Sequence, residues 1–409
     1  EGNESAPNDN VFETEGPDLT PPAIFNITVS RNVNSAIVRW QTNEPATSQV
    51  EYGETAAYGS QSPEDADLVT MHSVTLTGLA TSTVYHFRVK SSDGAGNQSI
   101  SDDRMFSTSA VAPEYRMIWA DSWHNGFLTP EETTNFVNTV AAANYNAIVV
   151  EVRKAGDAYY LSDYEPWASN LNPANYDALQ DLINKAHAVG IEVHAWIVTY
   201  RAWHKSFPTP PVGHVWREHG PGSANGDWSM RNVDNGYEEG SNLNIDPGVP
   251  GVQDYIANIV KDIVTKYPQL DGVNFDYIRY PGIAWGYNEI TKQRFQEEFG
   301  YPPPTSTADP NWGVWCDYRR QQVTDLVRKC FVEAMHINPR IKMSVDTVGL
   351  EGPDPSADYM GTPQYQNVFQ DARGWMESHI IDINILMNYK REFNATQKPN
   401  YRLWADWLP

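Results

Sequence analysis

Two aspartates stand at the ends of short segments in which apolar and polar side chains alternate. Asp276 ends residues 272–276, where it shares a face with Asn274, and Asp346 ends residues 341–346 in the same way. Such alternation is typical of a β-strand with one apolar face. Carboxyl groups at neighbouring strand ends can serve as general acid and as base or nucleophile, so we predict Asp276 and Asp346 to be catalytic. Two structural alternatives stay open: Asp276 could pair with Arg279, and Asp346 could cap a loop.

Further polar residues fall within or just after the other alternating segments. Glu151 and Arg153 share one face of residues 147–153, and His194 and Trp196 share one face of residues 191–197. An ion pair between Glu151 and Arg153, and a core histidine at position 194, are the structural alternatives. The predicted substrate contacts are Asp121, Glu151, Arg153, His194, Trp196, Asn274, Arg279, Asn388 and Tyr389.

These segments belong to a repeating pattern of strand, loop and helix. Strands are predicted at residues 116–121, 147–153, 191–197, 272–276, 341–346 and 382–388, with helices between them. Such repeats predict a parallel sheet, and polar residues at the strand ends favour a (β/α)8 TIM barrel over an open, doubly wound sheet. A closed barrel needs two strands more than these six. We therefore expect a barrel that is apparently truncated after its sixth strand, and a partner chain or further C-terminal segment that completes it.

The first part of the chain has a different pattern. Residues 1–20 hold six acids and no Lys or Arg, which predicts a flexible acidic leader. Residues 21–109 consist of short alternating runs separated by Gly, Pro and Asn, as in an all-β sandwich. With Trp40 and the spacing Leu79-x-x-x-Thr83-x-Tyr85, this segment resembles a fibronectin type III domain. The Tyr85 hydroxyl is expected to bond back to the chain, which makes it a structural residue.

Five longer motifs follow one another along residues 113–409. They are Val152-Arg-Lys-Ala-Gly-Asp-Ala-Tyr159, His187-x-x-Gly190-x-x-Val193-His-Ala-Trp196, Leu243-Asn-Ile-Asp-Pro-Gly248, Asp271-Gly-Val-Asn-Phe-Asp-Tyr-Ile-Arg-Tyr-Pro281 and Met387-Asn-Tyr389. Together they resemble the glycosyl-hydrolase-like 10 family. The resemblance implies a TIM barrel that acts as a glycoside hydrolase on a polysaccharide or glycan, with its active site at the C-terminal ends of the strands. The domain combination indicates a secreted or cell-surface protein.

Composition and missing motifs exclude several other classes of protein. The chain of 409 residues has 52 acids against 29 Lys and Arg, and its net charge of −23 argues against nucleic acid as a partner. No apolar run is long enough for a membrane span. The motifs HExxH, CxxC, G-x-S-x-G and the P-loop are absent, as are the His and Asp clusters of a dimetal phosphatase, so we expect no metal and no cofactor. Cys316 and Cys330 fall in one predicted helix, about 21 Å apart, and cannot pair.

A second function from another class is compatible with the same sequence. The barrel could be a non-catalytic glycan-binding module, or a structural part of a cell-surface assembly, because a fold alone does not determine function. The two hypotheses differ in one feature. An enzyme needs a second acid within about 10 Å of Asp276 across an open cleft, and a binding module does not.

Overall fold

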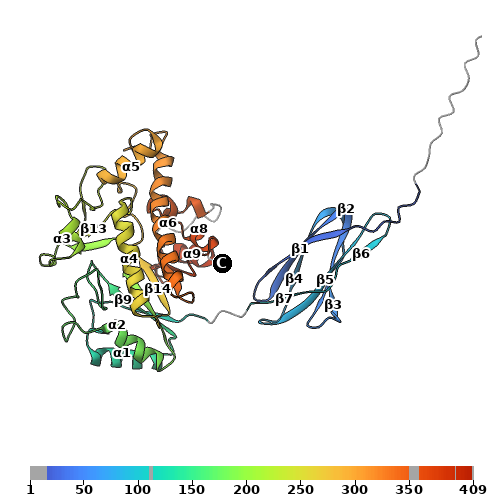
Figure 1. Ribbon diagram of the computed structural model, residues 1–409, viewed down its shortest axis with the longest axis horizontal. Helices are drawn as coiled ribbons and strands as arrows, with labels where there is room; N and C mark the ends of the chain where they lie inside the picture. Colours follow the sequence, from blue (N-terminus) through green and yellow to red (C-terminus); the bar gives the residue numbers. More distant parts are fainter. Residues whose placement is uncertain (1–15, 110–113, 350–358, 392, 408–409) are drawn as a thin grey trace, which may run out of the picture. The chain divides into compact units, whose positions relative to one another are not determined.

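The protein consists of two compact units, Glu1–Glu114 and Tyr115–Pro409. The computed structural model describes residues 16–109, 114–349, 359–391 and 393–407, so most of the predicted leader lies outside the described residues. Figure 1 shows the two units as ribbons, and each unit has a hydrophobic core of its own. We therefore describe each unit by itself.

The N-terminal unit is built from antiparallel strands. They are β1 (Ile24–Arg31), β2 (Ser35–Gly53), β3 (Ser60–Gln61), β4 (Asp65–Thr77), β5 (Val84–Ser92), β6 (Gln98–Ile100) and β7 (Arg104–Ser107). The long strand β2 belongs to two sheets: one with β1 and β4, and one with β3 and β5. Strand β5 also pairs with β6 and β7. This arrangement agrees with the sandwich predicted from the alternating runs.

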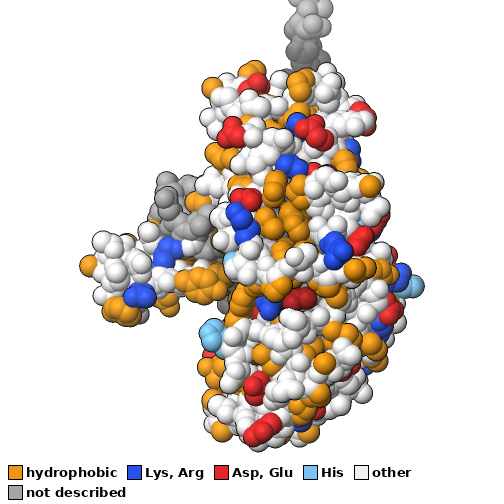
Figure 2. All heavy atoms as spheres, turned by 90° about the vertical axis from the view of Figure 1, so that its left-hand side faces the viewer, with side chains coloured by type: hydrophobic (Ala, Val, Ile, Leu, Met, Phe, Trp, Pro, Cys, Tyr) orange, Lys and Arg blue, Asp and Glu red, His pale blue; other side chains and the backbone are white. Residues whose placement is uncertain are grey.

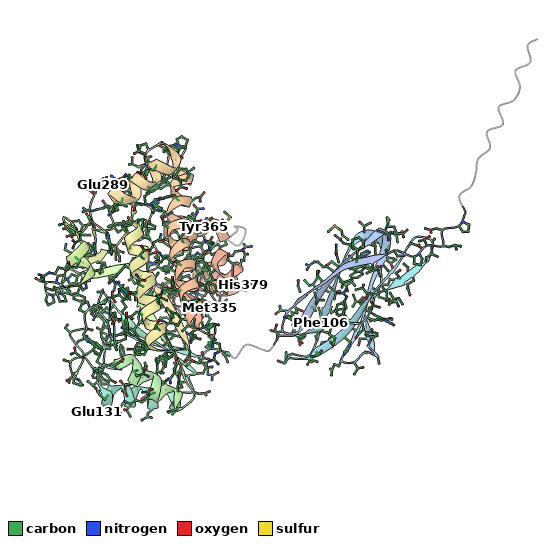
Figure 3. All side chains as sticks on the ribbon, viewed as in Figure 1. Phe106, Glu131, Glu289, Met335, Tyr365 and His379 are labelled. Carbon is green, nitrogen blue, oxygen red and sulfur yellow. The ribbon has the colours of Figure 1, made fainter. Side chains whose placement is uncertain are left out.

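The core of the sandwich contains the aromatic residues that carried the prediction. The Trp40 ring stacks on His72 with the ring centroids 4.9 Å apart, and both side chains are buried. The Tyr85 hydroxyl accepts the backbone N–H of Ala80 at 2.9 Å, which is the predicted bond back to the chain. Phe106 stacks on Tyr85 in the same core (Figure 3). Tyr85 is thus a structural residue, as expected.

The C-terminal unit is organised around a six-stranded sheet. Its strands are β8 (Met117–Ala120), β9 (Ala147–Arg153), β10 (Glu192–Val198), β14 (Gly272–Asp276), β15 (Lys342–Val348) and β16 (Ile383–Met387). All neighbouring strands are parallel, and their order in the sheet is their order in the sequence (Figure 1). The six predicted strands are confirmed to within two residues. Among the described residues β8 and β16 are the two ends of this sheet, and its completion into a barrel stays a prediction.

Helices follow the strands and cover the sheet with apolar side chains. They are α1 (Pro130–Ala142), α2 (Ala178–His187), α3 (Val215–His219), α4 (Pro250–Lys266), α5 (Glu289–Phe299), α6 (Trp312–Ile337), α7 (Pro363–Asn367), α8 (Ala372–Glu377) and α9 (Lys398–Trp407), with a 3-10 turn at Tyr359–Gly361. Helix α1 begins where Thr129 accepts the N–H of Glu132 and Pro130 occupies the first turn. The apolar stripe of α4, Ile256 to Ile263, is fully buried against the sheet. The free cysteines Cys316 and Cys330 both lie buried on α6.

One feature was not predicted from the sequence. Between β10 and α4 the chain forms a small antiparallel sheet of β11 (Arg201–His204), β12 (Glu238–Glu239) and β13 (Asn242–Asn244). It starts three residues after β10 ends, and so lies at the C-terminal end of the parallel strands. These strands are too short to show a period of two.

The surface mixes side chains of every kind. Figure 2 shows acidic and basic side chains interspersed with hydrophobic ones over one face of the molecule. None of the described helices is long and apolar enough to cross a membrane.

Candidate active site

The two predicted catalytic aspartates lie near the C-terminal ends of neighbouring strands, Asp276 as the last residue of β14 and Asp346 two residues before the end of β15. The register pairs Val198 of β10 with Asp276 of β14, and Phe275 of β14 with Val345 of β15. Asp276 and Asp346 are the next residues along these paired strands. The structure therefore brings together the carboxyl groups that the sequence singled out.

Both carboxyl groups are buried, and this changes their acidity. Asp276 is 6% exposed and Asp346 is 3% exposed. Burial, followed by the charge of Asp276, raises the pKa of Asp346 to about 8 against an opposing contribution from Asn274. Burial also raises the pKa of Asp276, but the charge of Arg279 and the N–H of Tyr277 oppose it. Near neutral pH the pair therefore holds a proton, and we assign it to Asp346 because Arg279 and the Tyr277 N–H stabilise the ionised form of Asp276.

Asn274 and Ser344 fix the position of Asp346. The Asn274 amide donates to a carboxylate oxygen of Asp346 at 2.9 Å, and its carbonyl oxygen accepts the Ser344 hydroxyl at 2.8 Å. All three side chains are buried, and the second oxygen of Asp346 has no partner among the described residues. Asn274, predicted to contact substrate, thus acts on Asp346. The alternative in which Asp346 caps a loop finds no hydrogen bond to support it among the described residues.

A cavity of 500 Å³ opens beside Asp276. It is lined by Asp276, Tyr277, Arg279, Val348, Gly349, Met387, Tyr389 and Lys390. Asp346 is not part of this lining, so Asp276 is the member of the pair that faces the open space. Tyr389 lines the cavity and is 83% exposed, and its contact with substrate stays a prediction. Its neighbour Asn388 donates to the backbone carbonyl of Tyr401 at 3.2 Å and holds the last helix.

Two arginines pack against the residue that follows Asp276. The guanidinium carbons of Arg201 and Arg279 lie 4.3 Å and 4.6 Å from the centroid of the Tyr277 ring. Tyr277 has a left-handed backbone with φ of 51°, which is costly for an aromatic residue, and its N–H donates to the carboxylate of Asp276 at 2.7 Å. No ion pair within 4.0 Å joins Asp276 to Arg279 among the described residues. The alternative of a structural ion pair is therefore wrong.

The expectation that Arg153 contacts substrate beside Glu151 is wrong because of a β-bulge. Trp196 pairs with Glu151 and Ile197 with Arg153, so Val152 is an extra residue and the two charged side chains point to opposite faces. Arg153 is fully buried on the helix side. Its Nε donates to Glu165 at 2.7 Å, and the hydroxyl of Tyr255 on α4 donates to the same carboxylate oxygen at 2.6 Å. The suggested pair between Glu151 and Arg153 does not form.

The expectation that His194 contacts substrate is also wrong, because it lies at the other end of the sheet. His194 pairs in register with Gly272, the first residue of β14, four residues and about 13 Å before Asp276. It is fully buried, contacts Glu192 at 3.3 Å and meets the Tyr115 ring edge-on. A Cβ at Gly272 would lie 2.1 Å from the imidazole, so the glycine makes room for it. The structural alternative of a core histidine is the correct one.

Glu151 and Trp196 do lie on the inward face near the pair. Trp196 stands in register between Glu151 of β9 and Asn274 of β14. Burial raises the pKa of Glu151 to about 7, although the hydroxyl and N–H of Ser122 both donate to its carboxylate. Glu151 therefore exchanges its proton near neutral pH. It remains a candidate substrate contact.

Asp121 lies in the loop after β8, where it holds a turn. Its carboxylate accepts the N–H groups of Trp123 and His124 and pairs with the His124 imidazole at 2.9 Å. Partial burial opposes ionisation, but the imidazole and these N–H groups outweigh it and lower the pKa of Asp121. Asp121 is thus an ionised acid at the same edge of the sheet.

Sequence reasoning missed three residues that shape this site, Tyr277, Arg201 and Lys390. Arg201 comes from the unpredicted sheet after β10, and Lys390 follows the predicted Asn388 and Tyr389. A basic residue in the loop three residues after a strand end is a signal that could have found Arg201, because the strand end limits where the next residues can lie.

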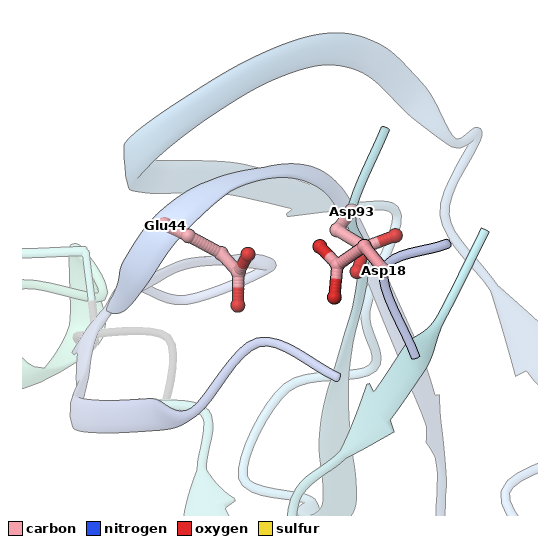
Figure 4. A group of neighbouring side chains, drawn as sticks. All are labelled: Asp18, Glu44 and Asp93. Atoms are coloured by element: carbon pink, nitrogen blue, oxygen red, sulfur yellow. The ribbon is translucent and has the colours of Figure 1, made fainter. Parts of the chain in front are cut away.

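Among the described residues one group of acids is spaced closely enough to hold a metal ion, and it lies in the N-terminal unit. Ligand atoms of Asp18, Glu44 and Asp93 come within 4.8 Å of one another (Figure 4). The Asp93 carboxylate already accepts the N–H groups of Ala95 and Asn97 and the side-chain amide of Asn97. The turn at residues 93–97 thus accounts for its position.

Comparisons with known proteins assign both units. A family model described as Glycosyl hydrolase-like 10 matches residues 114–407, and the model Purple acid Phosphatase, N-terminal domain, matches residues 22–108 of the fibronectin III-like sandwich. The glycosyl hydrolase YngK of Bacillus subtilis (strain 168) is 26% identical over 72% of this chain and 57% of its own length. The glycosyl hydrolase DigH of Escherichia coli (strain K12) is 29% identical over 58% of this chain and 53% of its own. The chain thus spans about half the length of these curated relatives.

Solved structures of low identity resemble parts of the chain. The catalytic domain of β-amylase from Paenibacillus polymyxa aligns with a TM-score of 0.45 at 12% identity, over 70% of this chain and 80% of that one. A β-galactosidase from Halorubrum lacusprofundi aligns with a TM-score of 0.44 at 14% identity, over 67% of this chain and 40% of that one.

Proposed function

The chain belongs to the glycosyl hydrolase-like 10 family, and from this premise we propose that its parallel-sheet unit is a glycoside hydrolase acting on a polysaccharide or glycan. The observation that carries the proposal is the buried pair of Asp276 and Asp346 beside a cavity. A glycan-binding module has no use for two buried carboxyl groups that share a proton, whereas acid catalysis requires one. We therefore favour the enzyme over the non-catalytic alternative.

The pair supplies the proton that cleavage needs. Asp276 faces the cavity, and Asp346 lies behind it with a pKa raised to about 8. In the proposed reaction the pair gives one proton, through Asp276, to the glycosidic oxygen as the bond to the anomeric carbon breaks. Water adds its hydroxide to that carbon and returns its proton to the pair, so the enzyme ends as it began.

The remaining residues have supporting roles in this proposal. Asn274 keeps Asp346 in place, Tyr389 at the cavity offers an aromatic surface to a sugar ring, and Trp196 lies beside Asn274 on the neighbouring strand. The fibronectin III-like sandwich precedes the parallel-sheet unit in the sequence, and this domain combination is the reason to propose a secreted or cell-surface enzyme.

Release of reducing ends from a panel of polysaccharides tests the proposal. We expect the wild-type protein to cleave at least one member of the panel and Asp276→Asn to cleave none at a comparable rate. The control is Asp254→Asn, because Asp254 is an exposed acid on α4 that pairs with Lys329 at the surface. Cleavage that survives in Asp276→Asn would contradict the assignment of the site.

A further inference from the structure

We propose that the cavity beside Asp276 binds an anionic group of the substrate through Arg201 and Arg279, so that the glycan carries a carboxylate or sulfate next to the bond that is cut. The inference rests on the proposed function, because it names the substrate class of the same site. It follows from two guanidinium groups that have no carboxylate within 4.0 Å among the described residues, although the charges of both act to lower the pKa of Asp276.

Arg201 and Arg279 are half-buried, and they differ from the buried arginines in what they contact. Among the described residues neither guanidinium donates a hydrogen bond to the protein, neither has a carboxylate within 4.0 Å, and the Nε of each is buried without a partner. The buried guanidinium of Arg319, in contrast, donates to the backbone carbonyls of Ile283 and Trp285 at 2.7 Å. Buried donors without partners are costly, so an external acceptor is expected.

The charge balance of the cavity points to an anion. Arg279 and Lys390 line the cavity, and Arg201 lies against Tyr277, which also lines it. These three cations face the Asp276–Asp346 pair, which holds a proton near neutral pH. The site is therefore positive in a chain whose net charge is −23. A planar guanidinium binds carboxylate or sulfate oxygens through two charge-assisted hydrogen bonds, whereas the hydroxyl oxygens of a neutral sugar accept hydrogen bonds without that charge assistance.

Both arginines are held in place before any ligand binds. The buried guanidinium of Arg153 donates to the backbone carbonyls of Thr199 and Arg201 at 3.1 Å, which fixes the start of β11. The ring of Tyr277 is fixed by its left-handed backbone and by the bond from its N–H to Asp276. Because both cations contact this ring, little conformational entropy remains to be lost on binding.

Binding to a matched pair of probes tests the inference. The probes are oligogalacturonate and its fully methyl-esterified form, which share a backbone and differ in charge, and a sulfated galactan oligosaccharide is the third. Calorimetry with Asp276→Asn gives dissociation constants without cleavage. We expect an acidic probe to bind at least about 10-fold tighter than the neutral ester, and this preference to weaken as salt rises from about 50 to about 500 mM.

Substitution of the arginines identifies the residues responsible. In the Asp276→Asn background, Arg279→Gln and Arg201→Gln should each abolish the preference for the acidic probe, while Arg279→Lys keeps part of it because the charge remains. The control is Arg217→Gln, which removes the same charge from an exposed residue on α3. Melting curves identify any variant that fails to fold. If an arginine variant fails to fold, the salt dependence of acidic-probe binding, measured on Asp276→Asn with both arginines intact, tests the anion site instead.

The outcomes separate this inference from the proposed function. Equal affinity for acidic and neutral probes, a preference that survives both substitutions, or no binding of either acidic probe would each overturn the anion site. If acidic probes bind through the arginines but the wild-type protein cleaves no glycan, the anion site stands and the proposed function fails. If the wild type cleaves a neutral glycan and binds both forms equally, the proposed function stands without the anion site.

Discussion

Arg153 is the last residue of β9 and Arg279 lies three residues after the end of β14 in the same sheet, yet their surroundings are opposite. Arg153 lies on the helix side of β9, fully buried, with Glu165 and three backbone carbonyls as acceptors. Arg279 lies at the cavity beyond β14, half-buried, with no acceptor among the described residues. A buried charge without a partner destabilises the folded state, so a charge with a purely structural role is paired or hydrogen-bonded. The difference teaches that the helix side of this sheet is built to be stable, and the cavity side is built to bind.

The largest expected effect is the loss of activity in Asp276→Asn, which tests whether the cavity side of the sheet serves catalysis. The amide keeps the shape of the side chain but cannot carry a proton, so turnover should fall by about 10²–10⁴-fold while the melting temperature changes little. Substrates with good leaving groups need less protonation and should lose less. The measurement compares an activated aryl glycoside with a natural linkage.

Equal losses on both substrates, together with a lower melting temperature, would show that Asp276 serves stability. Asp276 would then belong with Arg153 in its role, and the comparison between the two sides of the sheet would fail.

The second test acts on the helix side. Glu165→Gln leaves the charge of Arg153 buried and unpaired, so the free energy of unfolding should fall by about 3–5 kcal/mol. The control is Glu238→Gln in an exposed pair with Lys205, which should cost about 0–1 kcal/mol. Hydrogen exchange of β9 and α4 reports on the parallel-sheet unit separately from the sandwich. A loss of less than 1 kcal/mol would mean that this buried pair is not needed for stability.

The sequence predicted the strands well because their period of two is regular over five or more residues. It also predicted that Asp276 and Asp346 would meet, because parallel strands place their C-terminal ends at one edge. It could not predict the surroundings of Arg153. A single extra residue, Val152, reverses the face of every later side chain, and no residue type marks it.

Two further differences have other physical causes. Alternation predicts which face of the sheet a side chain lies on, but not how far it lies from the catalytic end of the strand. His194 and Trp196 were therefore both predicted to contact substrate, although His194 pairs with Gly272 and Trp196 with Asn274. Arg201 reaches the cavity from a sheet whose strands are too short for any pattern. Contacts between segments that are distant in the sequence decide which basic residue stays unpaired, and a local sequence pattern does not show such contacts.

A third prediction uses the pH dependence of stability. The pKa of Asp346 rises from its ordinary value of 3.8 to about 8, so the folded state holds a proton that the unfolded state has released over this interval. The stabilising contribution of the neutral carboxyl is complete below pH 3.8 and is lost as pH rises through 8. Asp346→Asn should therefore gain stability relative to the wild type as pH rises from 4 to 8.

Asp121→Asn is the matched control for this measurement, since the pKa of Asp121 is lowered. Its contribution is present above the ordinary value and lost as pH falls through the folded value, so the sign is opposite. Urea unfolding at a series of pH values gives both curves. A flat difference curve for Asp346→Asn would show that Asp346 is ionised throughout and holds no proton for the pair.

The smallest expected effect on activity belongs to His194, and it tests the height of a residue along one strand. His194 and Trp196 lie on the same face of β10, two residues apart, but His194 pairs with Gly272 and Trp196 with Asn274, the neighbour of Asp346. His194→Gln removes the contact with Glu192 and the packing on Tyr115, so the melting temperature should fall while kcat/KM, measured well below it, stays unchanged. Trp196→Ala on the same face should lower kcat/KM, because this ring lies beside the carboxyl pair. His194→Gln could instead lower kcat/KM as much as Trp196→Ala without loss of stability. The conclusion that His194 is structural and that only the C-terminal ends of the strands serve catalysis would then be wrong.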